Sequence, residues 1–176
     1  NKTEEKAVYT SIAKSIVQML EVLECRIYFD KENKFVLVGN SASEKSNCRY
    51  SKDDLLHREL IEQDNYLCVA IKNSTVPIGA IEILKDKDLE EDFVDVVISI
   101  GNLLGTTITL QKTIEEVHKI IENSEYNEFE LKKLRGEITA LIGDLCDYQQ
   151  NFVEALANAV DRKGQYKVSH SRNSAK

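Results

Sequence analysis

An apolar stripe in the last third of this 176-residue chain constrains its fold more than any other feature. The members of the stripe recur at alternating intervals of three and four, and they are Leu131, Leu134, Ile138, Leu141, Leu145, Tyr148, Phe152, Ala155 and Ala159. A repeat of about 3.5 residues keeps one stripe of a helix against a partner helix over many turns. The spacing therefore predicts a coiled coil, and the alternative is a helix that lies back on its own domain. Gly136 and Gly143 each weaken such a helix by roughly 1 kcal/mol relative to Ala, which makes the seam adjustable.

Two other stretches also have the period of an amphipathic helix. The first 23 residues carry one apolar stripe, formed by Val8, Ile12, Ile16, Met19, Leu20 and Leu23. From Asp88 a longer stripe runs without a stop signal as far as "ENSEYNE", and it contains Phe93, Val97, Ile100, Leu104, Ile108, Ile114 and Val117. We therefore expect a helix at the start of the chain and a long helix after its midpoint.

Between these helices the sequence favours strands. "CRIYFD" and "KFVLVGN" are rich in Ile, Val, Phe and Tyr and are joined by the polar "KEN", which predicts a hairpin. "NYLCVAIK" and "VPIGAIEILK" predict a second pair of strands around the turn "NST". Pro77 is the only proline of the chain, and it is best placed at a strand start or edge. The sheet should be antiparallel.

The segment between the two hairpins breaks the strand pattern. Residues 41–47 are polar, which predicts a loop. "SKDDLLHRELIEQ" follows, and Ser51 is a plausible N-cap ahead of an apolar set formed by Leu55, Leu56, Leu60 and Ile61. We therefore expect a loop and one short helix to interrupt the sheet.

Composition excludes several classes of partner. The formal net charge is -7, and no stretch concentrates basic residues with aromatic residues between them, which argues against a nucleic-acid partner. The four cysteines are far apart and form no CxxC pair, so neither a zinc site nor a secreted disulfide framework is indicated. A reducing cytoplasm is the compartment this favours. No apolar run approaches the roughly 20 residues of a membrane span, so we expect no membrane contact in this fragment.

The residues do not assemble an enzyme within 1–176. The three histidines lie in separate predicted elements, and no Ser-His-Asp set, paired carboxylates or phosphate loop is present. We therefore expect the fragment itself to have no catalytic activity.

"VPIGAIEILKDKDLEEDFVDVVISIGNLLGTTITL", residues 76–110, resembles the closing signature of a GAF domain. The resemblance implies an α+β fold in which the first and last helices cover one face of a central antiparallel sheet of five or six strands. A small-molecule pocket would lie on the other face, roofed by residues 41–64. We expect a GAF sensor domain over 1–122 and a coiled-coil linker helix over 123–151.

The same resemblance implies that the pocket residues are Cys48, Tyr50, His57, Tyr66 and Cys68. The Asn-Lys…Phe…Asp-Glu signature of GAF domains that bind cyclic nucleotides is not found in the right order. Cys48 is the only candidate for thioether attachment of a bilin, and it has no usual flanking His. His57 is the only candidate for an axial haem ligand, but its neighbours favour a solvated helix face. No ligand is assigned, and a degenerate GAF domain that binds nothing is the alternative.

"FVEALANAVDRKGQYKVSHSRNSAK", residues 152–176, resembles the first two helices of an HD-GYP phosphodiesterase domain. The matching positions are Ala159, Val160, Asp161, Lys163, Tyr166, His170, Ser171 and Ala175, while Lys167, Ser169, Asn173 and Ser174 depart from the family pattern. The resemblance implies that 152–176 is the truncated start of that domain. In the intact parent His170 would be the first ligand of a divalent metal such as iron or manganese. The fragment alone should hold no cofactor, because one imidazole cannot complete a catalytic metal site.

These inferences lead to one expected function. The chain should be a bacterial, cytoplasmic GAF sensor fragment that forms a homodimer and regulates a cyclic di-GMP phosphodiesterase in its parent. The predicted dimer is held by the first and last GAF helices and by the seam from Leu131 to Ala159. The alternative is a structural dimerisation module without a ligand.

Overall fold

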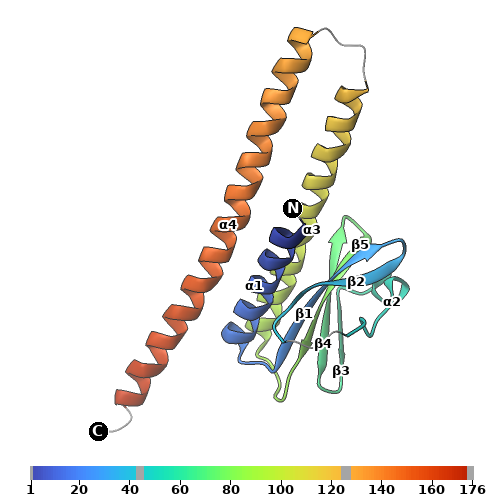
Figure 1. Cartoon of the computed structure of the whole chain (residues 1–176). Helices are drawn as coiled ribbons and strands as arrows, with labels where there is room; N and C mark the ends of the chain where they lie inside the picture. The colour runs from blue at the N-terminus through green and yellow to red at the C-terminus, as the bar shows by residue number, and fades with distance from the viewer. Residues whose placement is uncertain (1, 43–45, 124–127, 174–176) are drawn as a thin grey trace.

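The computed structural model describes the chain over residues 2–42, 46–123 and 128–173, apart from the side chains of 2, 160 and 163–173. Its elements in chain order are α1 (Lys2–Leu20), β1 (Glu24–Lys31), β2 (Lys34–Asn40), α2 (Lys52–Leu56), β3 (Leu60–Gln63), β4 (Tyr66–Asn73), β5 (Val76–Leu84), α3 (Glu91–Glu122) and α4 (Glu128–Asn173). Figure 1 shows a layered arrangement in which α1 and α3 lie on one side of the sheet and α2 on the other. The fold is α+β and is consistent with the GAF-like fold.

The sheet has five strands in the order β2-β1-β5-β4-β3, and every neighbouring pair is antiparallel, as predicted. The β1–β2 hairpin turns at Glu32 and Asn33, whose φ angles of 52° and 65° suit a two-residue turn. Pro77 lies near the start of β5, where the β4–β5 register shifts. Its missing N–H therefore removes few hydrogen bonds from the β4–β5 ladder. The prediction of a strand start or edge for Pro77 is confirmed by this position at the start of the central strand.

The main core lies between the sheet and the helices α1 and α3. Its fully buried members come from both sides, and they include Ile12, Ala13, Ile16, Ile27, Val69, Ile71, Ile81, Ile83 and Val97. The side chains that face this core alternate along each strand, as a half-buried strand requires. The predicted placement of the first and last domain helices on one face of the sheet is therefore observed.

α3 packs unusually close to the backbone of β4. A Cβ added at Gly105 would lie 2.1 Å from the carbonyl oxygen of Lys72, and one added at Gly101 would lie 3.2 Å from that of Ala70. Only a residue without a side chain allows this approach at Gly105. The two glycines let Leu104 and Ile108 reach deep into the main core.

The other face of the sheet is covered by the segment between β2 and β3, which we call the roof. Ser51 caps α2 as predicted, since its hydroxyl accepts from the backbone N–H of Asp54 while the Asp54 carboxylate accepts from the backbone N–H of Ser51. Leu55 projects from α2 into a second cluster with Ile61, Cys68, Ala70 and Ala80.

Two helix boundaries differ from the predictions. Leu60 and Ile61 were expected in the roof helix, but α2 ends at Leu56 and these residues form β3, where pairing with β4 outweighs the helical spacing of the leucines. The first helix ends at Leu20 rather than continuing to Leu23, because Glu21 has a φ of 55°. Leu23 is consequently 57% exposed.

The predicted stripe of α4 lies in part against its own chain. α4 runs antiparallel to α3 and also contacts α1 (Figure 1). Ile138 and Leu145 are buried with Ile114 and Ile121 of α3, whereas Leu141 is 50% exposed. This packing is the alternative that the stripe left open, and it uses only some of the stripe's members.

The expectation that no apolar run approaches the length of a membrane span is wrong for α3. It is long and apolar enough by composition, with a mean hydropathy of 1.6 over its best 18-residue window. Its residues Val97, Ile100 and Leu104 are buried in the main core, and core helices of globular proteins pass the same test.

Candidate functional site

A polar network lies on the roofed face of the sheet, where the GAF resemblance places a pocket. Because strand side chains alternate between faces, Glu24, Arg26 and Tyr28 of β1 share this face with Glu82 of β5. All four side chains are buried, and Glu82 is only 1% exposed. A carboxylate in such a position requires hydrogen-bond partners, because an unpaired buried charge is very costly.

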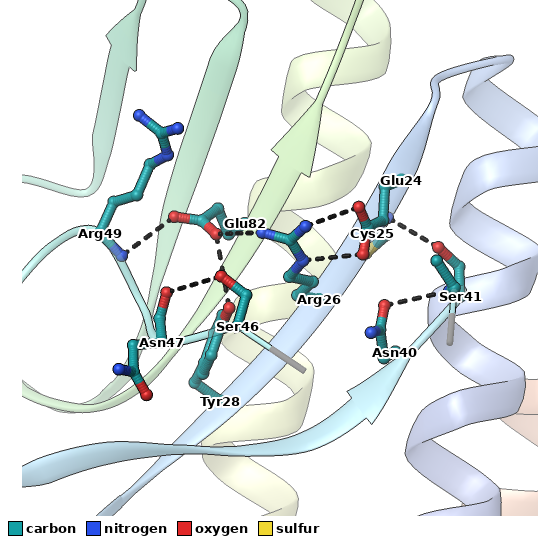
Figure 2. Close-up of polar contacts among 11 residues, drawn as sticks. Glu24, Cys25, Arg26, Tyr28, Asn40, Ser41, Ser46, Asn47, Arg49 and Glu82 are labelled. Carbon is teal, nitrogen blue, oxygen red and sulfur yellow. Dashed lines mark hydrogen bonds and ion pairs between the residues drawn. The ribbon is translucent and has the colours of Figure 1, made fainter. Parts of the chain in front are cut away.

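Glu82 finds its partners within the chain (Figure 2). Its Oε2 accepts from Arg26 Nη1 at 3.5 Å and from the Tyr28 hydroxyl at 3.4 Å, and its Oε1 accepts from the backbone N–H of Arg49 at 3.2 Å. Arg26 also donates to both carboxylate oxygens of Glu24, at 2.8 and 2.6 Å. We call these five residues the Glu82 network.

The network shifts the pKa values of Arg26 and Tyr28. The hydrogen bonds to Glu24 raise the pKa of Arg26 further above its ordinary value, so the guanidinium stays charged. Burial raises the pKa of the Tyr28 phenol, and the charge of Glu82 adds to the effect. Tyr28 is therefore a hydrogen-bond donor across the physiological pH range. The network pairs its buried charges with one another. It also attaches the roof to the sheet, since Arg49 belongs to the roof and Glu82 to the sheet.

Two of the predicted pocket residues are thiols, and the structure brings them together. Cys68 projects from β4 into the cluster beneath the roof, and Cys48 of the roof packs against the same cluster. A hydrogen bond between the two thiols lowers the pKa of Cys48 and, together with burial, raises the pKa of Cys68. Tyr50 packs beside them.

The other two predicted pocket residues lie apart from the thiols. His57 ends α2 and is exposed, and with Tyr50 it lines an open depression of about 500 Å³. Tyr66 lies beneath the guanidinium of Arg49, at 3.4 Å from its ring centroid, as a cation–π pair. The five predicted residues thus share one face of the sheet without converging on one point.

Metal ligands do not gather in the described part of the chain. Among residues 2–42, 46–123 and 128–162, no group of three or more His, Cys, Asp or Glu side chains could hold an ion. His170, the predicted metal ligand of the parent, lies in the last turns of α4, and its side chain is outside the described residues.

The Glu82 network was missed in the sequence, although a signal for it exists. Glu24, Arg26 and Tyr28 alternate with Cys25 and Ile27, a pattern that is ordinarily taken for a solvated strand face. Glu82 stands between isoleucines in the central apolar strand, where a charged residue requires a partner. Opposite charges on the two strands are the available signal, but the pairing of these strands with each other was not predicted.

No family model and no curated protein matches this chain. Among solved structures it is similar to a type II free methionine-R-sulfoxide reductase from Thermoplasma acidophilum. The TM-score is 0.51 and the identity 15%, over 60% of this chain and 92% of that chain. At this identity the similarity concerns the fold.

Proposed function

We propose that this chain is a bacterial, cytoplasmic signalling module that regulates an HD-GYP cyclic di-GMP phosphodiesterase domain in a longer parent protein. The observation that carries the proposal is the course of α4. Phe152, Val153 and Leu156 of this helix pack against the main core. The residues that resemble the HD-GYP start, 152–176, begin on the same helix, which runs unbroken to Asn173 where the resemblance implies two helices. A change in the sheet domain would therefore reach the catalytic domain through one rigid element.

A homodimer is part of the proposal. Several apolar side chains of the two long helices are 42–65% exposed, namely Leu110, Val117 and Ile120 on α3 and Leu141, Ile142 and Tyr148 on α4. Leu141 and Tyr148 belong to the seam of 131–159, so the members that do not pack within the chain are free to pack against a second copy. Cover from a second copy would remove this apolar area from water.

Sedimentation velocity at tens of micromolar tests the dimer with two leucines of the same helix. Leu141→Asp should produce monomers and lower the melting temperature only by the contribution of the lost dimer contacts, because Leu141 is 50% exposed in its own chain. Leu145→Asp should instead lower the melting temperature strongly, because Leu145 is 8% exposed and a buried unpaired charge costs several kcal/mol. A wild-type protein that sediments as a monomer would remove the dimer from the proposal.

Regulation is tested in the parent by cyclic di-GMP turnover. Leu156→Ala should change the basal rate and leave the metal content unchanged, since it loosens α4 from the main core. Asn158→Ala, an exposed position two residues on, is the matched control and should change neither. His170→Ala should abolish both turnover and metal binding if His170 is the first ligand. An unchanged rate in Leu156→Ala would argue against coupling through α4.

The second candidate function is a structural dimerisation module without a ligand. The Glu82 network favours it, because the buried polar groups of the network bond to one another. If a small molecule does bind, we expect it beneath the roof, near Cys48, Tyr50 and Tyr66. Native mass spectrometry of the purified protein distinguishes the two candidates, since a bound molecule whose removal alters turnover supports the sensor.

A further inference from the structure

Two of the four cysteines form a contact pair between the roof and the sheet. Cys68 is fully buried on β4, while Cys48 lies in the roof and is half-buried. The other two are far from this contact, since Cys25 faces the main core on the opposite side of the sheet and Cys146 is exposed on α4. The thiol pair is therefore a local site with one partly exposed and one buried cysteine.

The two sulfurs differ in chemistry. Cys48 accepts a hydrogen bond from the Cys68 thiol, and this lowers the pKa of Cys48 below its ordinary value. The backbone N–H of Tyr50 also bonds to Cys48 and acts in the same direction. Donating that hydrogen bond raises the pKa of Cys68, as does its burial. Cys48 is thus the sulfur that favours the thiolate, which is the reactive form, and Cys68 remains a thiol.

The surrounding structure holds the pair together and leaves it open from one side. Arg49, the residue after Cys48, donates its backbone N–H to Glu82 at 3.2 Å, and Glu82 is the register partner of Cys68. The roof is thereby fixed above Cys68. Tyr50 and Ile61, which belong to the same cluster as the thiols, line the open depression of about 500 Å³ beside α2. Cys48 does not line this depression but is only partly buried, so a small oxidant can reach it from the roof side.

We propose that Cys48 and Cys68 are a redox-active dithiol that a hydroperoxide converts to an intramolecular disulfide. The Cys48 thiolate attacks one oxygen of hydrogen peroxide, the O–O bond breaks, and the products are a sulfenic acid and hydroxide. The Cys68 thiol then attacks the Cys48 sulfur, the S–O bond breaks, and water leaves with the thiol proton. The two sulfurs are oxidised by two electrons in all, and the peroxide is reduced to water and hydroxide. The product ties the roof covalently to β4.

The test uses the whole chain with Cys146→Ser, which removes the exposed thiol that would link separate molecules. After treatment with hydrogen peroxide, trypsin digestion without reductant should yield peptide 46–49 joined to peptide 59–72. The mass of the joined peptides should be lower than that of the separate pair by two hydrogen atoms. Titration should find one free thiol, that of Cys25, where the untreated protein has three.

Two variants assign the roles. Cys68→Ser should stop the reaction at the sulfenic acid, so that a dimedone adduct accumulates on Cys48. Cys48→Ser should remove both the adduct and the disulfide, and a cooperative melt of each variant shows that it is folded. Oxidation of Cys48 to sulfinic acid in the protein that retains Cys68 would overturn the proposal, as would recovery of Cys68 as a free thiol after peroxide treatment.

Discussion

Replacing Gly105 with Ala should destabilise the protein, although the same change at Gly136 should stabilise it. Both glycines lie within long helices, where Ala is favoured over Gly by roughly 1 kcal/mol. A Cβ at Gly136 would meet nothing within 4 Å, whereas one at Gly105 would lie 2.1 Å from the carbonyl oxygen of Lys72. That oxygen belongs to the backbone of β4, so no rotation of a side chain can relieve the contact.

The size of the destabilisation by Gly105→Ala follows from the distance that α3 would have to move. Ordinary contact with a Cβ begins at 3.4 Å, so the helix must retreat from β4 by more than an ångström. Ile100, Leu104 and Ile108 would withdraw from the main core with it, which places the cost near the upper end of the 1–3 kcal/mol typical of overpacking. After the helix-propensity gain is subtracted, Gly105→Ala should lose about 2 kcal/mol and Gly136→Ala should gain about 1 kcal/mol.

Urea unfolding and calorimetry measure this difference. At roughly 2–4 °C per kcal/mol for a chain of this size, the two variants should differ in Tm by about 6–12 °C, with Gly136→Ala above the wild type. The urea m-value should stay constant, since neither change alters the surface exposed on unfolding. A Gly105→Ala protein at least as stable as the wild type would refute the close packing of α3 on β4.

Three further outcomes are expected. Glu82→Met should lower the free energy of unfolding by about 3 kcal/mol in urea titrations, because three donors lose their acceptor at about 1 kcal/mol each. The control Glu116→Met, at an exposed position, should change this free energy by less than about 0.5 kcal/mol. The pKa of Tyr28 is raised in the native state, so in the unfolded chain this phenol ionises first, near pH 10. The free energy of unfolding therefore falls as the pH rises further. Tyr28→Phe should reduce the loss of stability measured between about pH 8 and pH 11. Ser51→Ala should cost about 1 kcal/mol in the same assay through loss of the α2 cap, and Ser99→Ala, an exposed position inside α3, serves as its control.

The predictions held best where local chemistry decides the structure. The two hairpins were predicted because short polar turns separate runs of β-formers, and the positive φ of Asn33 is the conformation such a turn requires. The Ser51 cap was recognised for the same reason, since a capping side chain bonds to a backbone group three residues away. These interactions are encoded within a few residues.

The predictions failed where partners are distant in sequence. Leu60 and Ile61 fit the helical spacing, but strand pairing with Cys68 and Val69 decides their conformation. Glu82 and Arg26 are 56 positions apart, so their ion pair has no local signature. The α4 stripe illustrates a third difficulty, because a 3–4 spacing requires a partner helix but does not specify whether that helix belongs to the same chain.

The continuity of α4 gives the molecule a lever. The part of the helix beyond Leu156 reaches Asn173 with no further element packed around it in Figure 1. At a rise of about 1.5 Å per residue this arm is about 25 Å long, so tilting it by about 10° at Leu156 displaces its tip by about 4 Å. A repacking of the core too small to alter the sheet would thus be magnified severalfold at the far end of the helix. A group held at the tip of the arm would be moved by a distance comparable to the diameter of an atom, which is enough to separate groups that must meet for chemistry.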